Sequence, residues 1–169
     1  QSIRRDQSFE DTRRVVDMLR AAGITSLNMD ILYGFPFQTK ERMADSVQRV
    51  LSLSPDRVAL YGYAHVPWMA KRQVMIPADE LPSAEQRLEL FDTARELFLW
   101  DGYEEIGIDH YARPDDSLAL ANRKDTMRRN FQGYSDDTAD VLIGLGASSI
   151  SRFPQGYAQN ASSASAYTA

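Results

Sequence analysis

The chain has 169 residues, of which 43% are hydrophobic and 25% are charged, and its formal net charge is −5 at pH 7. This composition is typical of a folded globular protein, and the negative charge gives no support to a nucleic-acid partner, because phosphate binding requires a basic surface. There is no cysteine, which excludes disulfides, thiolate metal ligands and a cysteine nucleophile from this chain.

Neither membrane insertion nor secretion is predicted. No window reaches the roughly 18 uninterrupted apolar residues that a bilayer span needs. The first twenty residues, QSIRRDQSFEDTRRVVDMLR, lack the apolar core of a secretion signal. We therefore expect a cytoplasmic protein without membrane contact. The chain starts without Met, directly before a predicted helix, and stops in the small-residue tail NASSASAYTA. We expect it to be a piece of a longer protein.

The first predicted elements are a helix and a strand. Ser8 can cap a helix over about residues 8–22, where apolar residues recur at helical spacing until Gly23 offers a stop. The segment SLNMDILYG, residues 26–34, is a short apolar run ending in glycine, which is typical of a strand buried on both faces. It contains one acid, Asp30.

The same alternation continues. A second helix begins after Thr39 as its cap and ends before Pro55. A second strand, RVALYGY, covers residues 57–63. A capping-box sequence then begins the most regular helix at Ser83, and Gly102 ends it.

The last third of the chain is less regular. A third strand is predicted over residues 103–111, a short helix over 115–127, a loop over 128–135 and a fourth buried strand over 141–150. Strands separated by helix-sized segments predict an α/β fold with a parallel sheet and helices outside, either barrel-type or open and doubly wound. There are too few units to close a barrel.

Polar and small residues follow the predicted strands. In parallel α/β folds, binding groups gather where the strands end at their carboxyl side. We therefore expect one rim of the sheet to carry Gly34 and Pro36, Ala64 and His65, and His110 and Arg113.

Asp30 has two interpretations. A carboxylate in a buried strand costs several kcal/mol to desolvate unless it has a partner. That partner is either a basic side chain, which would make Asp30 a structural acid in a salt bridge, or a ligand and the backbone around it.

The two histidines also leave alternatives open. His65 and His110 at strand ends are either catalytic groups or hydrogen-bonded supports of other residues. Together with Asp30 and Asp109 they could form the site of a metal-assisted hydrolase. No H-x-H or H-E-x-x-H spacing is present, so the metal signal is weak.

The segment after residue 127 carries a basic pair and two glycines. Arg128 and Arg129 are either solvated surface charges or ligands for an acidic group. Gly144 and Gly146 lack the spacing of a phosphate loop, so we expect them to permit close backbone approach to something flat.

Five stretches of this sequence together resemble the oxygen-independent coproporphyrinogen III dehydrogenases, which are radical S-adenosylmethionine enzymes of haem biosynthesis. The resemblance covers nearly the whole chain, and HVPW, DHYARPDD and RRNFQGY in this order are its most specific parts. The stretches are NMDILYGFPFQT, GYAHVPWMAKRQ, LPSAEQRLELFDTARELFLWDGYEEIGIDHYARPDDSLALA, RRNFQGYS and LIGLGASSIS…YAQN.

The resemblance implies both a fold and a reaction. Residues 1–151 would form the second half of a partial (β/α)6 barrel, and residues 152–169 would start a C-terminal region. The complete enzyme would remove two propionate carboxylates of coproporphyrinogen III, giving the vinyl groups of protoporphyrinogen IX. It would use S-adenosylmethionine and a [4Fe-4S] cluster, receive electrons from a donor, and act as a monomer. This chain lacks the cluster's cysteines, so the fragment alone is expected to be inactive.

The resemblance also implies site residues, but it leaves the catalytic residues unknown and implies no metal ligand within this chain. Residues in the cofactor positions could bind the carboxylate, hydroxyl and ammonium groups of S-adenosylmethionine and contact its adenine. The implied cofactor residues are Arg5, Asp30, Ala64, Gln132 and Ile150, and the substrate-binding residues are His110, Arg113, Arg128 and Arg129.

Three other functions stay open. A haem-chaperone relative of the same superfamily shares the fold, but its N-x-x-Y-W pattern differs from the Asn-Phe-Gln-Gly-Tyr of residues 130–134. A non-catalytic tetrapyrrole-binding module and the metal-assisted hydrolase come from different classes of protein.

Overall fold

The computed structural model describes residues 7–131 and 133–169 of the chain. The chain divides into two compact units, residues 1–119 and residues 120–169. The boundary predicted after residue 151 falls inside strand β7 (Ile150–Phe153), which lies within the second unit.

The described part of the first unit has three long helices, and each begins where the sequence places a cap. The side chains of Ser8, Thr39 and Ser83 accept hydrogen bonds from backbone N–H groups three residues further on. Gln86 completes the capping box at Ser83. The helices are α1 (Phe9–Ala21), α2 (Lys40–Ser52) and α3 (Ala84–Trp100), so the three predicted helices are confirmed.

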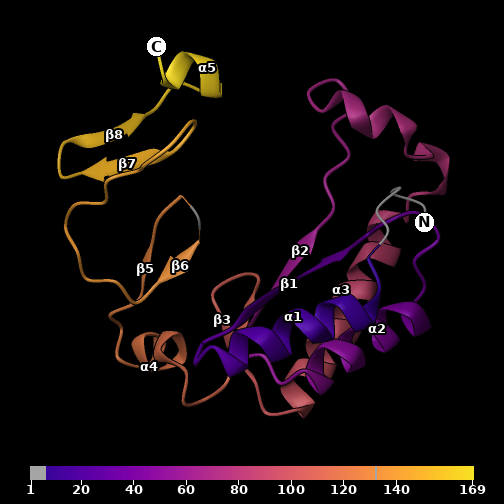
Figure 1. Cartoon of the computed structure of the whole chain (residues 1–169). Helices are drawn as coiled ribbons and strands as arrows, with labels where there is room; N and C mark the ends of the chain where they lie inside the picture. The colour runs from indigo at the N-terminus through magenta and orange to yellow at the C-terminus, as the bar shows by residue number, and fades with distance from the viewer. Residues whose placement is uncertain (1–6, 132) are drawn as a thin grey trace. The chain divides into compact units, whose positions relative to one another are not determined.

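Four strands form the sheet of this unit in the order β1-β2-β4-β3, and Figure 1 labels β1, β2 and β3. They are β1 (Asn28–Tyr33), β2 (Arg57–Gly62), β3 (Glu104–Ile106) and β4 (His110–Ala112). β1 and β2 are parallel, whereas β4 runs antiparallel to both β2 and β3. The predicted α/β class is confirmed, but the prediction of a wholly parallel sheet is wrong.

The difference arises in residues 103–111, which form a hairpin instead of one strand. The chain reverses at Gly107, whose φ of 62° lies in the left-handed region that glycine adopts without strain. β4 therefore returns beside β3 and inserts between β3 and β2. The reversal also decides where the residues after the hairpin lie.

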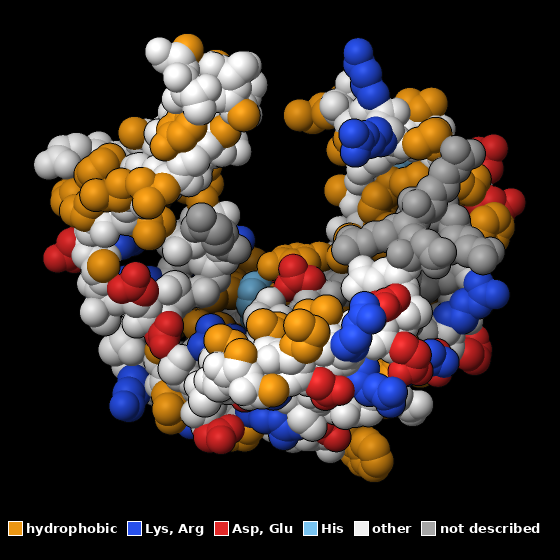
Figure 2. Space-filling model, in the orientation of Figure 1, with side chains coloured by type: hydrophobic (Ala, Val, Ile, Leu, Met, Phe, Trp, Pro, Cys, Tyr) orange, Lys and Arg blue, Asp and Glu red, His pale blue; other side chains and the backbone are white. Residues whose placement is uncertain are grey.

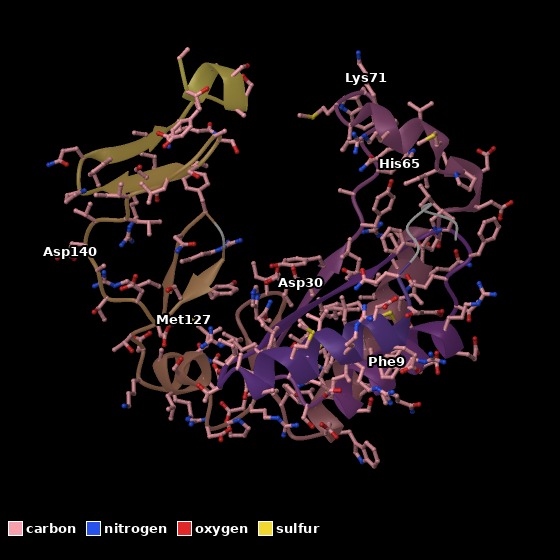
Figure 3. The ribbon with its side chains drawn as sticks, in the orientation of Figure 1. Phe9, Asp30, His65, Lys71, Met127 and Asp140 are labelled. Atoms are coloured by element: carbon pink, nitrogen blue, oxygen red, sulfur yellow. The ribbon has the colours of Figure 1, made fainter. Side chains whose placement is uncertain are left out.

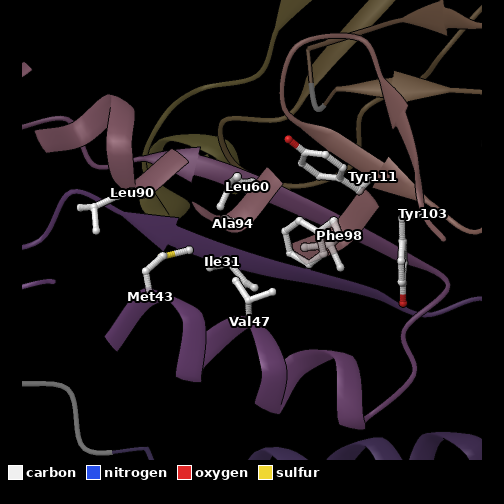
Figure 4. Packing of buried hydrophobic residues seen from close by; sticks show 10 residues of the cluster. Ile31, Met43, Val47, Leu60, Leu90, Ala94, Phe98, Tyr103 and Tyr111 are labelled. Atoms are coloured by element: carbon white, nitrogen blue, oxygen red, sulfur yellow. The ribbon is translucent and has the colours of Figure 1, made fainter. Parts of the chain in front are cut away.

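The helices α2 and α3 cover one face of the sheet. The hydrophobic core lies between these helices and the sheet (Figure 4). Phe98 of α3 packs against Tyr111 of β4, with ring centroids 4.8 Å apart. The core cluster consists of Ile31, Met43, Val47, Val58, Leu60, Leu90, Ala94, Phe98, Tyr103 and Tyr111.

The opposite face of β1 is not covered by described residues. Ile31 is buried at 7% exposure, whereas Asn28, Asp30 and Leu32 are exposed. Alternating residues of a strand point to opposite faces, so β1 is buried on one face only. The prediction of a strand buried on both faces is wrong for β1.

A segment with short 3-10 helices connects β2 to α3. It contains η1 (Lys71–Met75) and η2 (Ala78–Glu80). Exposed hydrophobic side chains lie on the surface of the chain (Figure 2), and in this segment Trp68 is 75% and Met69 79% exposed.

The second unit consists mainly of hairpins. α4 (Ser117–Arg123) spans the division between the units and is followed by β5 (Arg128–Arg129), β6 (Tyr134–Ser135), β7, β8 (Gly156–Gln159) and α5 (Ala164–Tyr167). β5 pairs with β6 and β7 with β8, both antiparallel. Residues 128–129 and 134–135, which lie in the segment predicted as a loop, therefore form short paired strands.

The fourth buried strand predicted over residues 141–150 is wrong. Leu145 is 82% exposed, and the segment holds only an isolated bridge from Leu142 to Arg152 before β7 begins at Ile150. The backbone at Gly144 lies close to that of Ile150, and only glycine leaves room for this approach. A Cβ at Gly144 would lie 2.9 Å from the Ile150 nitrogen, a distance that real Cβ atoms do not show.

Candidate functional site

Asp30 lies in the middle of β1, on the face of the sheet turned away from the helices (Figure 3). Its carboxylate is exposed and accepts a hydrogen bond from Asn28 Nδ2 at 2.8 Å. No ion pair to Asp30 occurs within residues 7–131 and 133–169. The expectation of a costly buried acid is therefore wrong, and so is the internal salt bridge as far as the described residues go.

A row of residues crosses the sheet at the level of Asp30. Asp30 is in register with Ala59 of β2, and Ala59 is in register with His110 of β4. Residues paired in this way point to the same face of a sheet. Asp30 and His110 therefore share one face, with the small side chain of Ala59 between them.

Tyr61 and Asp109 add to this polar group. The Tyr61 ring meets the His110 ring edge to face, with centroids 6.0 Å apart. Burial, and then the negative charges of Asp30 and Asp109, raise the pKa of Tyr61. Asp109 Oδ1 lies 2.7 Å from His110 Nδ1, a contact that fixes the orientation of the His110 ring. The face thus combines one exposed acid, a protonated phenol and an oriented imidazole.

Sequence reasoning missed Tyr61, although a signal was present. In a strand with period two, Tyr61 must point to the same face as Ala59. Tyr61 lies two residues after Ala59 and therefore extends the polar face toward the carboxyl end of β2.

Ala64 and His65 lie at the carboxyl end of β2, as predicted, separated from the strand by Tyr63. Tyr63 donates its N–H to the carbonyl of Tyr33 at 2.7 Å, which continues the β1–β2 pairing beyond the strand. Ala64 is exposed. His65 Nδ1 lies 3.0 Å from the Tyr63 hydroxyl, so in the described structure His65 is the hydrogen-bonded support of another residue.

The prediction that Arg113 lies at the same rim of the sheet as Ala64 is wrong. Because residues 103–112 turn back as a hairpin, β4 carries the chain toward the start of β2. The Arg113 N–H donates to the Asp56 carbonyl at 2.9 Å, and its guanidinium lies over the Tyr103 ring at 5.0 Å. Arg113 therefore lies at the end of the sheet where β2 begins, whereas Ala64 lies at the end where β2 finishes.

In the second unit, the basic pair is held by contacts within the unit. Arg128 Nη1 donates to the Thr138 carbonyl at 3.0 Å and lies 3.7 Å from the Asp140 carboxylate. The Arg129 guanidinium lies over the Tyr134 ring at 5.4 Å. The two arginines are exposed but oriented, which differs from freely solvated charges.

Arg152 was missed by the sequence reasoning and lies beside Arg128. Its Nη2 donates to the Ala139 carbonyl at 2.7 Å, and Arg128 Nη1 lies 3.4 Å from the same oxygen.

Ile150 is the first residue of β7 and pairs with Gln159 of β8. Asn160 fixes the preceding turn, because its Nδ2 donates to the carbonyls of both Gly144 and Gly146.

Two predicted cofactor residues, Arg5 and Gln132, lie outside the described residues. Within those that are described, no group of three or more His, Asp or Glu side chains could hold a metal ion. The metal-assisted hydrolase thus gains no support. The sequence supplies no thiolate for an iron–sulfur cluster, so the residues of this chain do not fit that group. No helix in the described parts of the chain is long and apolar enough to cross a bilayer.

Known proteins match the chain over nearly its whole length. It is 70% identical over 167 residues to an oxygen-independent coproporphyrinogen III oxidase of Paracoccus denitrificans, covering 99% of this chain and 37% of the relative. A protein of the same name from Cereibacter sphaeroides is 60% identical over 165 residues, 98% of this chain and 37% of that one. No family model matches.

A solved structure matches as well. The coproporphyrinogen III oxidase of Escherichia coli, described as a radical SAM enzyme, superposes with a TM-score of 0.91 at 40% identity, covering 96% of this chain and 37% of that one. The resemblance found in the sequence is confirmed. The chain spans a little over a third, 37%, of the relatives it matches.

Proposed function

We propose that this chain is a segment of an oxygen-independent coproporphyrinogen III oxidase. The complete enzyme would convert two propionates of coproporphyrinogen III into vinyl groups with loss of carbon dioxide, giving protoporphyrinogen IX. The observation that carries the proposal is the 70% identity over 99% of the chain to a relative of that name. The TM-score of 0.91 to a solved enzyme of the same activity supports it.

The cofactors of such an enzyme are S-adenosylmethionine and a [4Fe-4S] cluster. When bound, they would supply the radical that removes hydrogen from a propionate side chain. Residues outside this chain would hold the cluster, because the chain has no cysteine. An electron donor would reduce the cluster, and we infer a cytoplasmic monomer with a partial (β/α)6 barrel.

The cofactor contacts that we propose for the first unit are Asp30 and Ala64. The Asp30 carboxylate is exposed and accepts a hydrogen bond from Asn28 Nδ2. It can therefore accept hydrogen bonds from ligand hydroxyl or ammonium groups without breaking an ion pair. Ala64 is an exposed residue close to the end of β2. Ile150, Arg5 and Gln132 keep the cofactor roles that the resemblance implies.

For the substrate, we propose contacts from His110, Arg128 and Arg129. The substrate carries carboxylates around a flat ring, and guanidinium groups bind carboxylates through charge-assisted hydrogen bonds. Arg129 is stacked on Tyr134, which leaves its guanidinium oriented before a ligand arrives. The position of Arg113 over Tyr103 supports a structural role in place of the substrate role predicted for it.

The experiment is a replacement within a complete relative. The matching 167 residues of the Paracoccus denitrificans enzyme are exchanged for this chain, and the chimera is reconstituted with iron and sulfide without oxygen. We expect it to cleave S-adenosylmethionine and to form protoporphyrinogen IX from coproporphyrinogen III. A folded, cluster-loaded chimera that does neither contradicts the proposal. Cleavage without decarboxylation, together with haem binding, would favour the haem-chaperone alternative.

A further inference from the structure

The backbone that leaves β2 is paired with a side chain instead of a strand. Gln73 Nε2 donates to the Ala64 carbonyl at 3.1 Å, and Gln73 Oε1 accepts from the Val66 N–H at 2.6 Å. A primary amide offers one acceptor and a donor at fixed spacing. It bridges Ala64 and Val66 in the way that a neighbouring strand would, with His65 between them.

Gln73 is itself fixed by the helical turn that carries it. Its N–H donates to the Ala70 carbonyl at 2.8 Å, and its carbonyl accepts from the Ile76 N–H at 2.9 Å. The neighbours Arg72 and Val74 are exposed, whereas Gln73 is half-buried. The short helix η1 thus presents this amide to the strand exit.

A second long side chain holds the residue just before this segment. Arg87 of α3 donates from Nη1 to the Tyr63 carbonyl at 2.7 Å. Two glycines make room for its guanidinium, because a Cβ at Gly34 would lie 2.9 Å from Nη1 and a Cβ at Gly62 would lie 2.8 Å from Nη2. Residues 63–66 are therefore held by Arg87 at their start and by Gln73 over the rest.

We propose that Gln73 is a positioning residue that presets the backbone of Ala64 for the nucleoside end of S-adenosylmethionine. This inference rests on the proposed function. A ligand that binds exposed backbone must otherwise order that backbone first, and a preset segment removes the entropy cost. Gln73 does this through Ala64 and need not contact the ligand.

Two substitutions separate the two halves of the bridge. Gln73→Glu keeps an acceptor for the Val66 N–H but replaces the donor to Ala64 with an oxygen that repels its carbonyl. Gln73→Met has a similar length and removes both hydrogen bonds. Gln48→Glu, at an exposed position of α2, is the matched control for the added charge.

The first readout is amide hydrogen exchange in the 169-residue chain, without any ligand. Losing one net hydrogen bond should accelerate exchange of the Val66 amide by about tenfold in Gln73→Met. Gln73→Glu should keep the Val66 amide protected. Equal exchange of Val66 in wild type and Gln73→Met would show that the bridge does not hold this segment, and the proposal fails.

The second readout is S-adenosylmethionine affinity in the cluster-loaded chimera. We expect both Gln73 variants to bind about tenfold more weakly than wild type, with unchanged melting temperature, and Gln48→Glu to bind normally. If wild type binds and both variants bind equally well, the positioning role is wrong and the proposed function stands. If wild-type chimera does not bind S-adenosylmethionine, the proposed function fails and takes this inference with it.

Discussion

Asp30 of β1 and His110 of β4 point from the same face of the sheet because each is in register with Ala59 of β2. They come from elements 80 residues apart in sequence (110 − 30), and only the insertion of β4 beside β2 brings them into one row. An acid and an oriented imidazole thus share the face of the sheet that is turned away from α2 and α3.

Replacing Asp30 should affect ligand binding far more than stability. The side chain is exposed and has no ion pair among the described residues, so Asp30→Ala should change the free energy of unfolding by no more than about 0.5 kcal/mol. Losing a charged hydrogen bond of about 1.5 to 3 kcal/mol should weaken S-adenosylmethionine binding to the chimera by roughly tenfold or more. Asp17→Ala, at an exposed position of α1, is the control. Unchanged affinity in the folded Asp30 variant would refute the cofactor role.

Arg113 and Arg129 should give opposite results when their charge is reversed. Arg113→Glu loses the cation over Tyr103 and should lower the free energy of unfolding by about 1 kcal/mol while the Michaelis constant for coproporphyrinogen III stays the same. Arg129→Glu should raise that Michaelis constant roughly tenfold with little change in stability. Urea titrations and anaerobic kinetics of the chimera measure both effects. A raised Michaelis constant in a fully stable Arg113→Glu enzyme would restore the substrate role first predicted for it.

Tyr111→Phe should leave the chain equally stable or stabilise it. The Tyr111 hydroxyl is buried and has no hydrogen-bond partner among the described residues, so its removal relieves a desolvation cost of about 1 kcal/mol. A loss of more than about 1 kcal/mol in urea titrations would reveal a partner for the hydroxyl.

The same variant should change the stability at high pH. Burial, and then the nearby Glu105 carboxylate, raise the pKa of Tyr111. An unfolded tyrosine loses its proton above about pH 10. The folded state then holds more protons than the unfolded state, so stability falls as pH rises above this value. Tyr111→Phe should remove up to about 1.4 kcal/mol per pH unit from that slope. Burial also raises the pKa of Tyr103, so part of the pH slope should remain in this variant. An identical slope above pH 10 would contradict the burial of this phenol.

Gly62 and Arg87 should be energetically coupled. An Ala at position 62 would meet Arg87 Nη2 at 2.8 Å and should displace the guanidinium from the Tyr63 carbonyl. In the Arg87→Met background the same substitution meets no guanidinium and should cost less. A double-mutant cycle should give a coupling energy of about 0.5 kcal/mol or more. Additive effects would show that the glycine does not make room for Arg87.

The isolated 169-residue chain should hold no iron–sulfur cluster after reconstitution, because it has no cysteine. The chimera, treated in parallel, should show cluster absorbance. A stable cluster in the isolated chain would require ligands that the proposed assignment does not include.

Local signals predicted the helices well, whereas the strand arrangement needed contacts between distant residues. Ser8, Thr39 and Ser83 mark helix starts through hydrogen bonds that span three residues, so the sequence alone reveals them. Gly107 could equally interrupt or end a strand, and the reversal there depends on β4 pairing with β2.

The same reason explains the errors at the candidate site. Whether Asp30 is buried depends on what covers the second face of β1, which the apolar run around Asp30 does not encode. Arg113 was predicted at the wrong end of the sheet, because the turn at Gly107 was not predicted and it reverses the direction of the chain that follows. Gln73 and Arg87 carry no motif, and only their hydrogen bonds to the strand exit identify them.

Among the described strands, β1 ends the sheet on one side. Such a strand offers unpaired backbone groups to other chains, and a charge in the middle of it discourages edge-to-edge aggregation. Asp30 is that charge, next to the exposed Leu32. The carboxylate proposed to bind the cofactor would thus also keep the chain dispersed while it folds, and its loss should first appear as light scattering at high protein concentration.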